Sequence, residues 1–344
     1  MATIKEISQK AGVSIATVSK VMNGKAGVTD AVREKVLAVA RELNYHPNLN
    51  ARYLKSGSSR TVGIITEDLT VFNAPEIIDG IAADLENSGY HYILSNLRFY
   101  KRYGNGPRDI KESDALLHSA IDDMLAKQVD GIIYIGCHSH VVVSLPDHSS
   151  LKFVCAYCVS DNPEIPSVIY NDEKAAFEAT ELLLNNGCKK VGMITGPSDS
   201  IHSANRIRGH QLALYEHEIP YNPHLTMVGD WGRDCGNSSA ETLIGMGVDG
   251  IFVHNDIMAV GVMDYCAKAN IVVGKDLKLV GFDNREISSV IRPALSTVSL
   301  PLFEIGQKSA EWMLRLLNHE PHMDSRTLLD CTIIERESTK AESI

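Results

Sequence analysis

The amino-acid sequence predicts an α-helical helix-turn-helix domain at the N-terminus, followed by a two-lobed α/β domain with parallel sheets. Three short amphipathic patterns within residues 3–47 are typical of a helix-turn-helix domain. From Thr61 onward, short apolar runs alternate with amphipathic stretches. This alternation indicates parallel strands covered by helices on both faces. It restarts near residue 173, so we expect two similar lobes.

Capping signals divide the N-terminal segment into its three helices. Thr3-Ile4-Lys5-Glu6 has the form of a capping box, and the helix that it opens should end at Gly12. Ser14 should cap a second helix that ends at Asn23-Gly24. Thr29 should cap a third helix, in which apolar residues recur at helical spacing.

The rest of the chain divides into strands and helices of ordinary length. We expect strands at residues 61–66, 90–96, 131–135, 151–158, 190–195, 226–228, 250–254, 277–282 and 327–334. We expect helices at residues 75–88, 114–129, 173–186, 205–217, 237–245, 256–270 and 303–318. The first lobe should then comprise about 60–159 and 290–322, and the second about 160–289 and 323–344.

The composition is typical of a globular protein, with 344 residues of which 44% are hydrophobic and 22% are charged. No apolar run of 18 residues occurs, and the polar N-terminus lacks the apolar region of a secretory signal. We therefore expect a cytoplasmic protein without membrane contact. The seven cysteines are scattered through the chain, which suits reduced thiols.

Two small groups of residues could indicate metal or redox chemistry, and we favour a structural explanation for both. Cys155 and Cys158 lie in an apolar run that resembles a buried strand. His138, His140 and His148 lie in a loop-like segment, where solvated histidines are commoner than metal ligands. The sequence also lacks a phosphate-binding loop and a catalytic constellation. We expect no metal, no cofactor and no enzymatic activity.

Charge is distributed unevenly along the chain. Residues 1–60 contain ten Lys or Arg and four acidic residues, a net charge of +6. The whole chain carries −10, so the remainder carries −16. A compact basic module joined to an acidic body indicates that contact with a polyanion is confined to one end.

A series of short motifs runs through the first 52 residues. They are Thr3-Ile4-Lys5-Glu6-Ile7-Ser8, Ala11-Gly12-Val13-Ser14, Thr17-Val18-Ser19-Lys20-Val21, Asn23-Gly24, Val28-Thr29, Arg33-Glu34-Lys35-Val36, Leu43-Asn44-Tyr45, Pro47-Asn48 and Ala51-Arg52. With these motifs the chain resembles the LacI/GalR family of bacterial repressors over almost its whole length. The resemblance implies a DNA-binding domain at 1–47, a hinge at 48–59, and an effector-binding and dimerisation domain at 60–344 that is similar to periplasmic sugar-binding proteins.

The resemblance places the second helix in the major groove of DNA. Ile15, Ala16 and Lys20 would then meet base edges, the first two through apolar contact and the lysine by donating to guanine. A second set of side chains could bond phosphates without reading sequence. These are Ser14, Thr17, Ser19, Asn23 and Thr29. Val18 and Val21 are expected to pack in the core.

The segment after the third helix matches the family's hinge helix, which forms on DNA and enters the minor groove. The matching residues are Asn50, Ala51, Arg52 and Leu54. Leu54 corresponds to the leucine that wedges into the central base step. A solvated linker whose leucine packs against the body is the alternative.

The resemblance also implies a small-molecule site between the two lobes. Arg206, Asn255 and Asp283 match the family's polar ligand residues, although Asn255 could instead be a helix cap. Phe72, Tyr170 and Trp231 match aromatic positions of the same site.

Three positions depart from the pattern of sugar-responsive members. Tyr134 and Cys158 stand where many have polar ligand residues, so we expect both to line the effector site. Leu300 replaces a usual glutamine. This less hydrophilic first lobe leaves open a sugar, a nucleoside or a glycoside with an apolar aglycone.

Three functional interpretations follow. The leading one is a homodimeric repressor at the nucleoid that binds a near-palindromic double-stranded operator and is controlled by a sugar-like effector. The second is a regulator controlled mainly by a phosphocarrier protein. The third, from another class, is a small-molecule binding protein without a DNA role. The C-terminal tail shows no leucine heptad, which favours a dimer over a tetramer.

Overall fold

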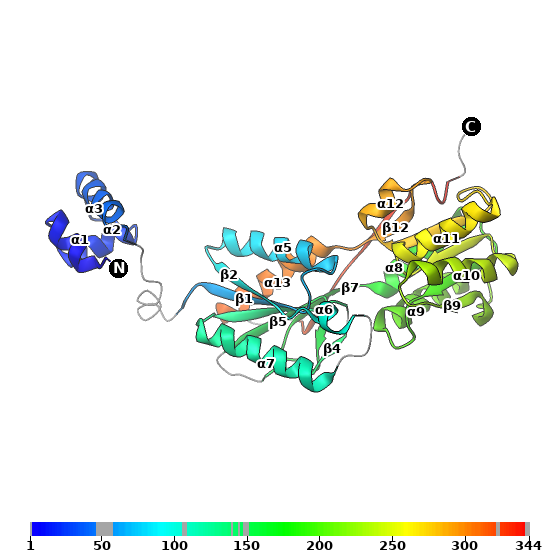
Figure 1. Ribbon diagram of the computed structural model, residues 1–344, viewed down its shortest axis with the longest axis horizontal. Helices are drawn as coiled ribbons and strands as arrows, with labels where there is room; N and C mark the ends of the chain where they lie inside the picture. Colours follow the sequence, from blue (N-terminus) through cyan, green and yellow to red (C-terminus); the bar gives the residue numbers. More distant parts are fainter. Residues whose placement is uncertain are drawn as a thin grey trace. The chain divides into compact units, whose positions relative to one another are not determined.

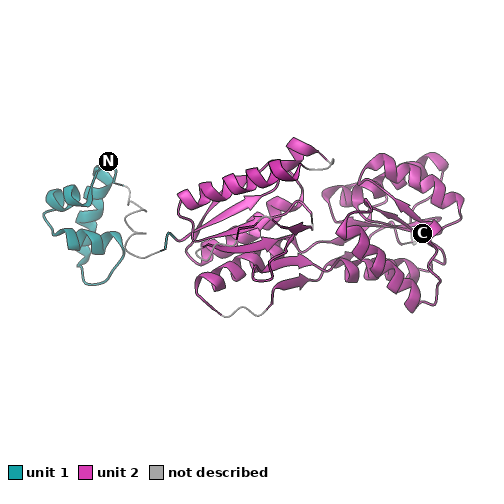
Figure 2. Cartoon of the chain, turned by 90° about the horizontal axis from the view of Figure 1, so that it is seen from below, with its two compact units in different colours: residues 1–59 teal, residues 60–344 magenta. Residues whose placement is uncertain are grey.

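The computed structural model describes residues 2–45, 58–104, 109–138, 140–143, 145–146, 151–320 and 324–340. The chain divides into two compact units, Met1–Ser59 and Arg60–Ile344, coloured teal and magenta in Figure 2. Within the described residues, no helix has the length and apolar character needed to cross a membrane.

Three helices build the N-terminal unit: α1 (Ile4–Ala11), α2 (Ile15–Met22) and α3 (Asp30–Glu42). Their apolar faces meet in a small core that consists of Ile7, Ala11, Val18, Val21, Val36 and Ala40. This arrangement confirms the predicted helix-turn-helix fold.

The helix ends follow the predicted capping chemistry with one exception. Thr3 and Glu6 form a reciprocal capping box, and Gly12 ends α1 in a left-handed conformation with φ 64°. Ser14 caps α2 through its side chain, which accepts a hydrogen bond from the Thr17 amide at 3.0 Å. Thr29 stands at the predicted cap position of α3, but its side chain makes no capping hydrogen bond.

The first lobe of the second unit contains a six-stranded, fully parallel sheet in the order β13-β7-β5-β3-β1-β2. Its strands are β1 (Thr61–Thr66), β2 (His91–Asn96), β3 (Gly131–Ile135), β5 (Lys152–Ala156), β7 (Ser167–Tyr170) and β13 (Arg326–Leu329). Helices α5 (Asn73–Asn87) and α13 (Leu302–Leu317) pack on one face, and α7 (Ile110–Ala126) on the other (Figure 1). Shorter elements are α6 (Phe99–Tyr103) and the paired strands β4 (Val141–Val142) and β6 (Val159–Ser160).

The second lobe repeats this plan with the sheet order β14-β12-β11-β10-β8-β9. Its strands are β8 (Val191–Thr195), β9 (Thr226–Val228), β10 (Gly250–Val253), β11 (Lys278–Asp283), β12 (Ser296–Ser299) and β14 (Thr332–Ile334), the last of which is antiparallel to its neighbour. Helices α8 (Asp172–Asn185) and α9 (Ile201–Glu216) cover one face, and α10 (Arg233–Gly245) and α11 (Asp256–Ala269) cover the other. The short helices η1 (Pro223–Leu225) and α12 (Glu286–Val290) complete the lobe.

The predicted lobe boundaries were wrong in three places. Strand β7 belongs to the first sheet, so the first crossing to the second lobe follows Tyr170 rather than residue 159. Strand β12 belongs to the second sheet, so the return crossing lies near residue 300 rather than 290. The single strand predicted at 327–334 is two strands, of which β13 pairs in the first lobe and β14 in the second.

The register of the sheets gathers the carboxyl ends of neighbouring strands. In the first sheet Thr66 pairs with both Asn96 and Ile135. In the second, Asp283 pairs with Ser299. Loops that follow strands therefore emerge along one edge of each sheet, which is the usual position of ligand sites in open α/β sheets.

Helices α5 and α13 cross at a close approach of backbone to backbone. Gly80 of α5 faces the turn of α13 that contains Phe303, and Gly306 of α13 faces Ile77 and Ile81. A Cβ atom added at Gly80 would collide with the Phe303 carbonyl oxygen. This helix pair therefore depends on residues without side chains at the crossing.

Candidate functional site

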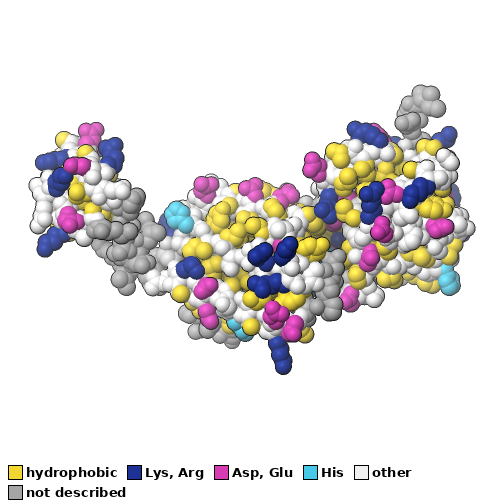
Figure 3. All heavy atoms as spheres, in the orientation of Figure 1, with side chains coloured by type: hydrophobic (Ala, Val, Ile, Leu, Met, Phe, Trp, Pro, Cys, Tyr) yellow, Lys and Arg dark blue, Asp and Glu magenta, His cyan; other side chains and the backbone are white. Residues whose placement is uncertain are grey.

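Helix α2 buries one face and exposes the other. Val18 and Val21 are buried in the helical core, as predicted. Ile15 is 52% exposed, and Ala16 and Lys20 are also exposed. These three side chains contribute little to the core, so they are available for contact with another molecule. Figure 3 shows Lys and Arg side chains on the visible face of this unit.

The polar residues around α2 hold its ends and remain near the surface. Ser14 Oγ lies 2.8 Å from Thr17 Oγ1, and Asn23 Nδ2 donates to the Ser19 carbonyl oxygen at 2.7 Å. Thr29 is exposed. The predicted hinge residues lie outside the described residues; they are Asn50, Ala51, Arg52 and Leu54.

Arg206, on α9, is the centre of a buried polar cluster in the second unit. Its Nε donates to Asp172 Oδ1 at 2.7 Å, its Nη2 donates to the Tyr170 hydroxyl at 2.8 Å, and its Nη1 donates to the His254 carbonyl oxygen. The guanidinium also lies 3.5 Å from the centroid of the Phe282 ring. All three nitrogens are engaged, and the side chain is almost fully buried.

Asp172, at the start of α8, pairs with two groups of α9. Besides Arg206, it contacts His202, whose Nδ1 lies 2.7 Å from Asp172 Oδ2. Burial raises the pKa of the Asp172 carboxyl, but His202 and Arg206 outweigh burial and bring the pKa below its usual value. Asp172 is therefore a buried carboxylate that neutralises Arg206.

Aromatic rings join this cluster to the first lobe. Tyr157, which follows β5, has its ring centroid 5.4 Å from that of Tyr170 and 6.0 Å from that of His202. Tyr170 ends β7 and stacks on His202 at 5.5 Å. The ends of two first-lobe strands thus meet helix α9 of the second lobe, near the point where the chain crosses between the lobes.

Asp283, at the end of β11, faces the same cluster, but its hydrogen bonding and exposure differ from those of Asp172. Its carboxylate receives no hydrogen bond from the described residues, and the side chain is only partly buried. Burial raises its pKa well above the usual value, although Arg206 opposes the rise. Among the described residues, Asp283 therefore has no hydrogen-bond donor.

Four non-glycine residues in and near this cluster have left-handed backbone. Tyr157, Trp231, Asp283 and Asn284 have φ values of 62°, 70°, 103° and 52°. Non-glycine residues rarely adopt positive φ, and where they do the surrounding structure must hold them in place, as it does at many functional sites.

Asn255 and Trp231 form a separate arrangement at the start of α11. Asn255 Oδ1 accepts from the Met258 amide at 2.8 Å, and its Nδ2 donates to the Trp231 carbonyl oxygen at 3.1 Å. The Trp231 ring packs against Gly196. Asn255 thus acts as a helix cap, the alternative that the sequence left open.

Phe72 links the first lobe to Arg285 of the second. Phe72 precedes α5, and the Arg285 guanidinium lies 5.3 Å from the centroid of its ring. Such a distance is within the range of a cation–π contact. Phe72 is partly buried, so part of the ring remains accessible.

Tyr134 and Cys158 do not join the Arg206 cluster. Both belong to a hydrophobic core that α7 forms with the first sheet, separate from the core that contains Tyr157 and Tyr170. The Tyr134 hydroxyl donates to Glu67 Oε1 at 2.8 Å. Burial raises the pKa of the Cys158 thiol well above its usual value, so the thiol stays protonated. Their side chains serve the interior of the first lobe in this structure.

Sequence reasoning missed several members of the cluster. Asp172 and His202 are partners of Arg206, and His254 supplies the carbonyl oxygen that Arg206 binds. The His254 ring is fully buried, and neither of its nitrogens has a hydrogen-bond partner among the described residues. Burial, with Arg206 nearby, lowers the pKa of His254 well below its usual value and keeps it neutral.

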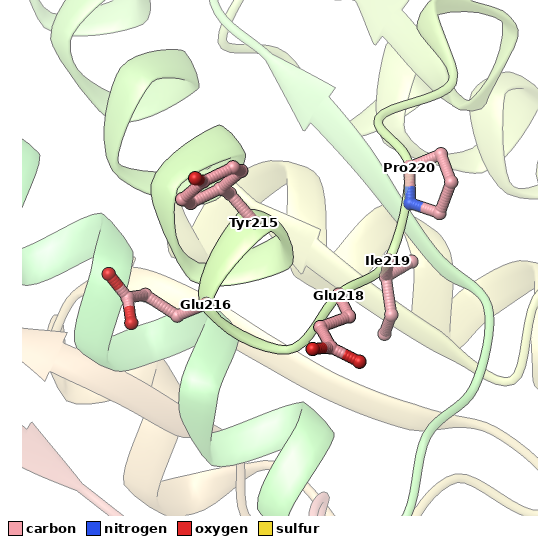
Figure 4. A pocket seen from close by; sticks show the side chains of 5 residues that line it. All are labelled: Tyr215, Glu216, Glu218, Ile219 and Pro220. Atoms are coloured by element: carbon pink, nitrogen blue, oxygen red, sulfur yellow. The ribbon is translucent and has the colours of Figure 1, made fainter.

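A surface hollow in the second lobe lies at the end of α9 and is distinct from the cluster. It is lined by Tyr215, Glu216, Glu218, Ile219 and Pro220 (Figure 4). The hydrogen-bond partners of Arg206, which are Asp172, Tyr170 and His254, do not line this hollow. Within the described residues, no group of three or more His, Cys, Asp or Glu could hold a metal ion.

Two family models match the chain. Bacterial regulatory proteins of the lacI family match residues 3–48, and the periplasmic binding protein-like domain matches residues 180–339. Catabolite control protein A of Priestia megaterium is 33% identical over 342 residues, which cover 98% of this chain and 99% of that protein. The HTH-type transcriptional repressor CytR of Escherichia coli K12 is 29% identical over 343 residues, covering 99% and 97%.

Solved structures show the same architecture. The lac repressor dimer bound to operator and the anti-inducer ONPF has a TM-score of 0.78 at 24% identity and covers 99% of each chain. CcpA of Lactococcus lactis has a TM-score of 0.66 at 27% identity and covers 81% of this chain and 99% of its own. A helix-turn-helix unit joined to a two-lobed binding-protein fold defines a DNA-binding transcription regulator. The chain belongs to the LacI family.

Proposed function

We propose that this regulator is a homodimeric repressor that binds a near-palindromic operator and releases it when a small, sugar-like molecule binds between the lobes. The observation that carries the DNA part is the exposed face of α2, where Ile15, Ala16 and Lys20 stand outside the core. A helix of this kind reads base edges in the major groove. Such binding would locate the protein at the nucleoid.

The effector part is supported by the cluster at the lobe crossing. Tyr157 follows strand β5 and Tyr170 ends strand β7 of the first lobe, whereas Arg206 and Asp283 come from the second lobe. A molecule bound there would contact both lobes and so favour one arrangement of them. Related structures carry such molecules: the lac repressor was solved with ONPG and the regulator CelR with cellobiose.

Dimerisation is supported by the edge of the first sheet. Strand β2 is the last strand in its sheet, and Tyr92 and Leu94 on it are 45% and 37% exposed. An exposed apolar edge strand favours contact with another chain. A two-fold dimer would present two α2 helices to two half-sites.

The test is selection of a binding site from a random DNA library, followed by gel-shift titration of the full chain. We expect a near-palindromic site whose affinity falls steeply as salt increases. Lys20→Ala should weaken binding by about 1–3 kcal/mol and relax preference at one base position.

The control is Lys10→Ala, because Lys10 is paired with Glu42 at 2.6 Å and lies on α1. This variant should keep the base preference of the parent. Recovery of no DNA site by a protein with an intact fold would contradict the proposal.

A further inference from the structure

The charge balance of the effector cluster restricts what it can bind. Arg206 is the cation expected to hold an anionic ligand, but Asp172 already neutralises it through a 2.7 Å contact. Its other nitrogens donate to Tyr170 and to the His254 carbonyl oxygen. Phe282 covers one face of the guanidinium. Arginine often binds phosphate through two parallel N–H donors, and Arg206 has no free pair of donors to offer without losing a present partner.

Two further carboxyl groups lie near this arginine. Asp283 is partly accessible and has no hydrogen-bond donor among the described residues. Asp256 is buried, and its oxygens accept from the Thr297 hydroxyl and the Arg285 amide. Arg285 is the other cation that faces Asp283, and its guanidinium is stacked on Phe72. Arg336 and Arg285 both offset the charge of Asp256. Asp172 is the carboxylate in direct contact with Arg206, so the Arg206 charge is already offset and attracts a bound anion only weakly.

Asp283 instead needs a hydrogen-bonding partner. A partly buried carboxyl group without a hydrogen bond is costly, and a ligand hydroxyl, which can both donate and accept, would remove that cost. The rings of Tyr157, Tyr170 and Phe72 supply apolar faces at the same crossing. Uncharged molecules with several hydroxyl groups and an apolar ring face combine both properties.

We propose that Asp172 sets the charge specificity of this site: by neutralising Arg206 it makes the site accept an uncharged, hydroxyl-rich effector and reject the phosphate ester of the same molecule. This inference deepens the proposed function, because it rests on the same site between the lobes. Asp172 acts through Arg206 and is a positioning residue. If this is so, the effector is a free sugar or nucleoside, and the phosphorylated forms of these molecules do not bind.

The experiment uses inorganic phosphate as the probe and the unfolding temperature of the full chain as the readout, with sodium chloride at equal ionic strength as reference. The parent protein should show no saturable increase with phosphate. Asp172→Asn should gain a saturable increase, since the variant frees Arg206 to bind the anion. The gain should disappear in the double variant Asp172→Asn, Arg206→Lys, which lacks the planar fork.

The matched control is Asp264→Asn. It removes one negative charge from the same lobe, at a partly buried carboxylate whose Oδ2 lies 2.6 Å from Arg233 Nε. It should gain nothing from phosphate, so net charge alone is excluded as the cause. A folded Asp172→Asn protein that gains nothing would overturn the proposal.

A second arm needs no variant. The parent protein is titrated with matched pairs, each a hexose or nucleoside and its monophosphate. Any compound that raises the unfolding temperature should be the uncharged member, with the ester at least about tenfold weaker. An ester that binds as well as its parent compound, or a saturable phosphate effect on the parent that Arg206→Lys abolishes, would overturn the charge rule. Loss of operator binding alone would sink the proposed function and leave these outcomes unchanged.

Discussion

His210 is a buried residue that should make the fold sensitive to acid. Its Nδ1 lies 3.0 Å from Thr180 Oγ1, and burial lowers its pKa from 6.5 to about 4. The unfolded chain therefore binds a proton at pH values where the folded chain does not. The free energy of unfolding should fall as the pH falls from 6.5 to 4, by about 3 kcal/mol from this residue.

Urea titrations between pH 7 and pH 4 check this expectation. His210→Gln should flatten the pH dependence of the unfolding free energy, whatever its effect at pH 7. His319 is exposed, so His319→Gln should leave the dependence as it is. His254 contributes in the same direction, since burial lowers its pKa as well. An unchanged slope in His210→Gln would show that His210 is protonated in the fold.

Site residues that belong to a sequence motif could be predicted. Site residues whose role depends on a contact with a distant part of the chain could not. Arg206 and Tyr170 are brought together, and Asp283 faces them, as the resemblance implied. Asp172 was missed because an acid in the first turn of a helix is ordinary in sequence. Its role depends on a contact with a side chain 34 positions later. The hydrogen bond from Tyr134 to Glu67 could not be predicted, because strand alternation alone did not show which sheet face Tyr134 occupies.

At the scale of elements, the α5–α13 crossing gives a sharp packing test. Gly80→Ala would place a methyl group against the Phe303 carbonyl oxygen, so the two helices must separate. We expect a loss of stability of about 1–3 kcal/mol, measured by urea unfolding of the full chain.

Gly245→Ala is the matched control, because Gly245 ends α10 and nothing lies within 4 Å of the added Cβ. There the helix propensity of alanine should dominate and raise stability by up to about 1 kcal/mol. Equal effects at the two glycines would mean that propensity, rather than the crossing, determines the result.

Long elements could be predicted better than short ones. The helices of both lobes were expected close to where they lie, since each shows several turns of apolar periodicity. Strands β7 and β12 were missed, and each has four residues. The strand expected at 327–334 is interrupted by Asp330 and Cys331, which carry the chain between sheets. Nothing in the local sequence indicates that the two halves of this run pair with different sheets.

At the scale of the whole molecule, the proposed dimer should depend on the edge strand β2. Leu94→Lys places a charge on this exposed apolar strand, and it should change the stability of the monomer little because Leu94 is exposed there. The dissociation constant of the dimer should rise at least about tenfold, measured by analytical ultracentrifugation. Operator affinity should weaken in parallel, because two half-sites are read together.

Ile110→Lys is the comparison variant. Ile110 is 69% exposed at the start of α7, on the opposite face of the first lobe from α5. It should dimerise as the parent does. A Leu94→Lys protein that stays dimeric at the same concentration would place the interface elsewhere.

The interleaving of the two lobes has a consequence for synthesis on the ribosome. Strands β13 and β14 are the last of the chain, and each completes the border of a different sheet. Neither lobe can therefore close until translation has almost finished, whereas α1 to α3 have emerged long before. The helix-turn-helix unit is therefore synthesised well before the two-lobed unit is complete. Premature termination before residue 326 would remove one edge strand from each lobe and leave the N-terminal helix-turn-helix unit intact.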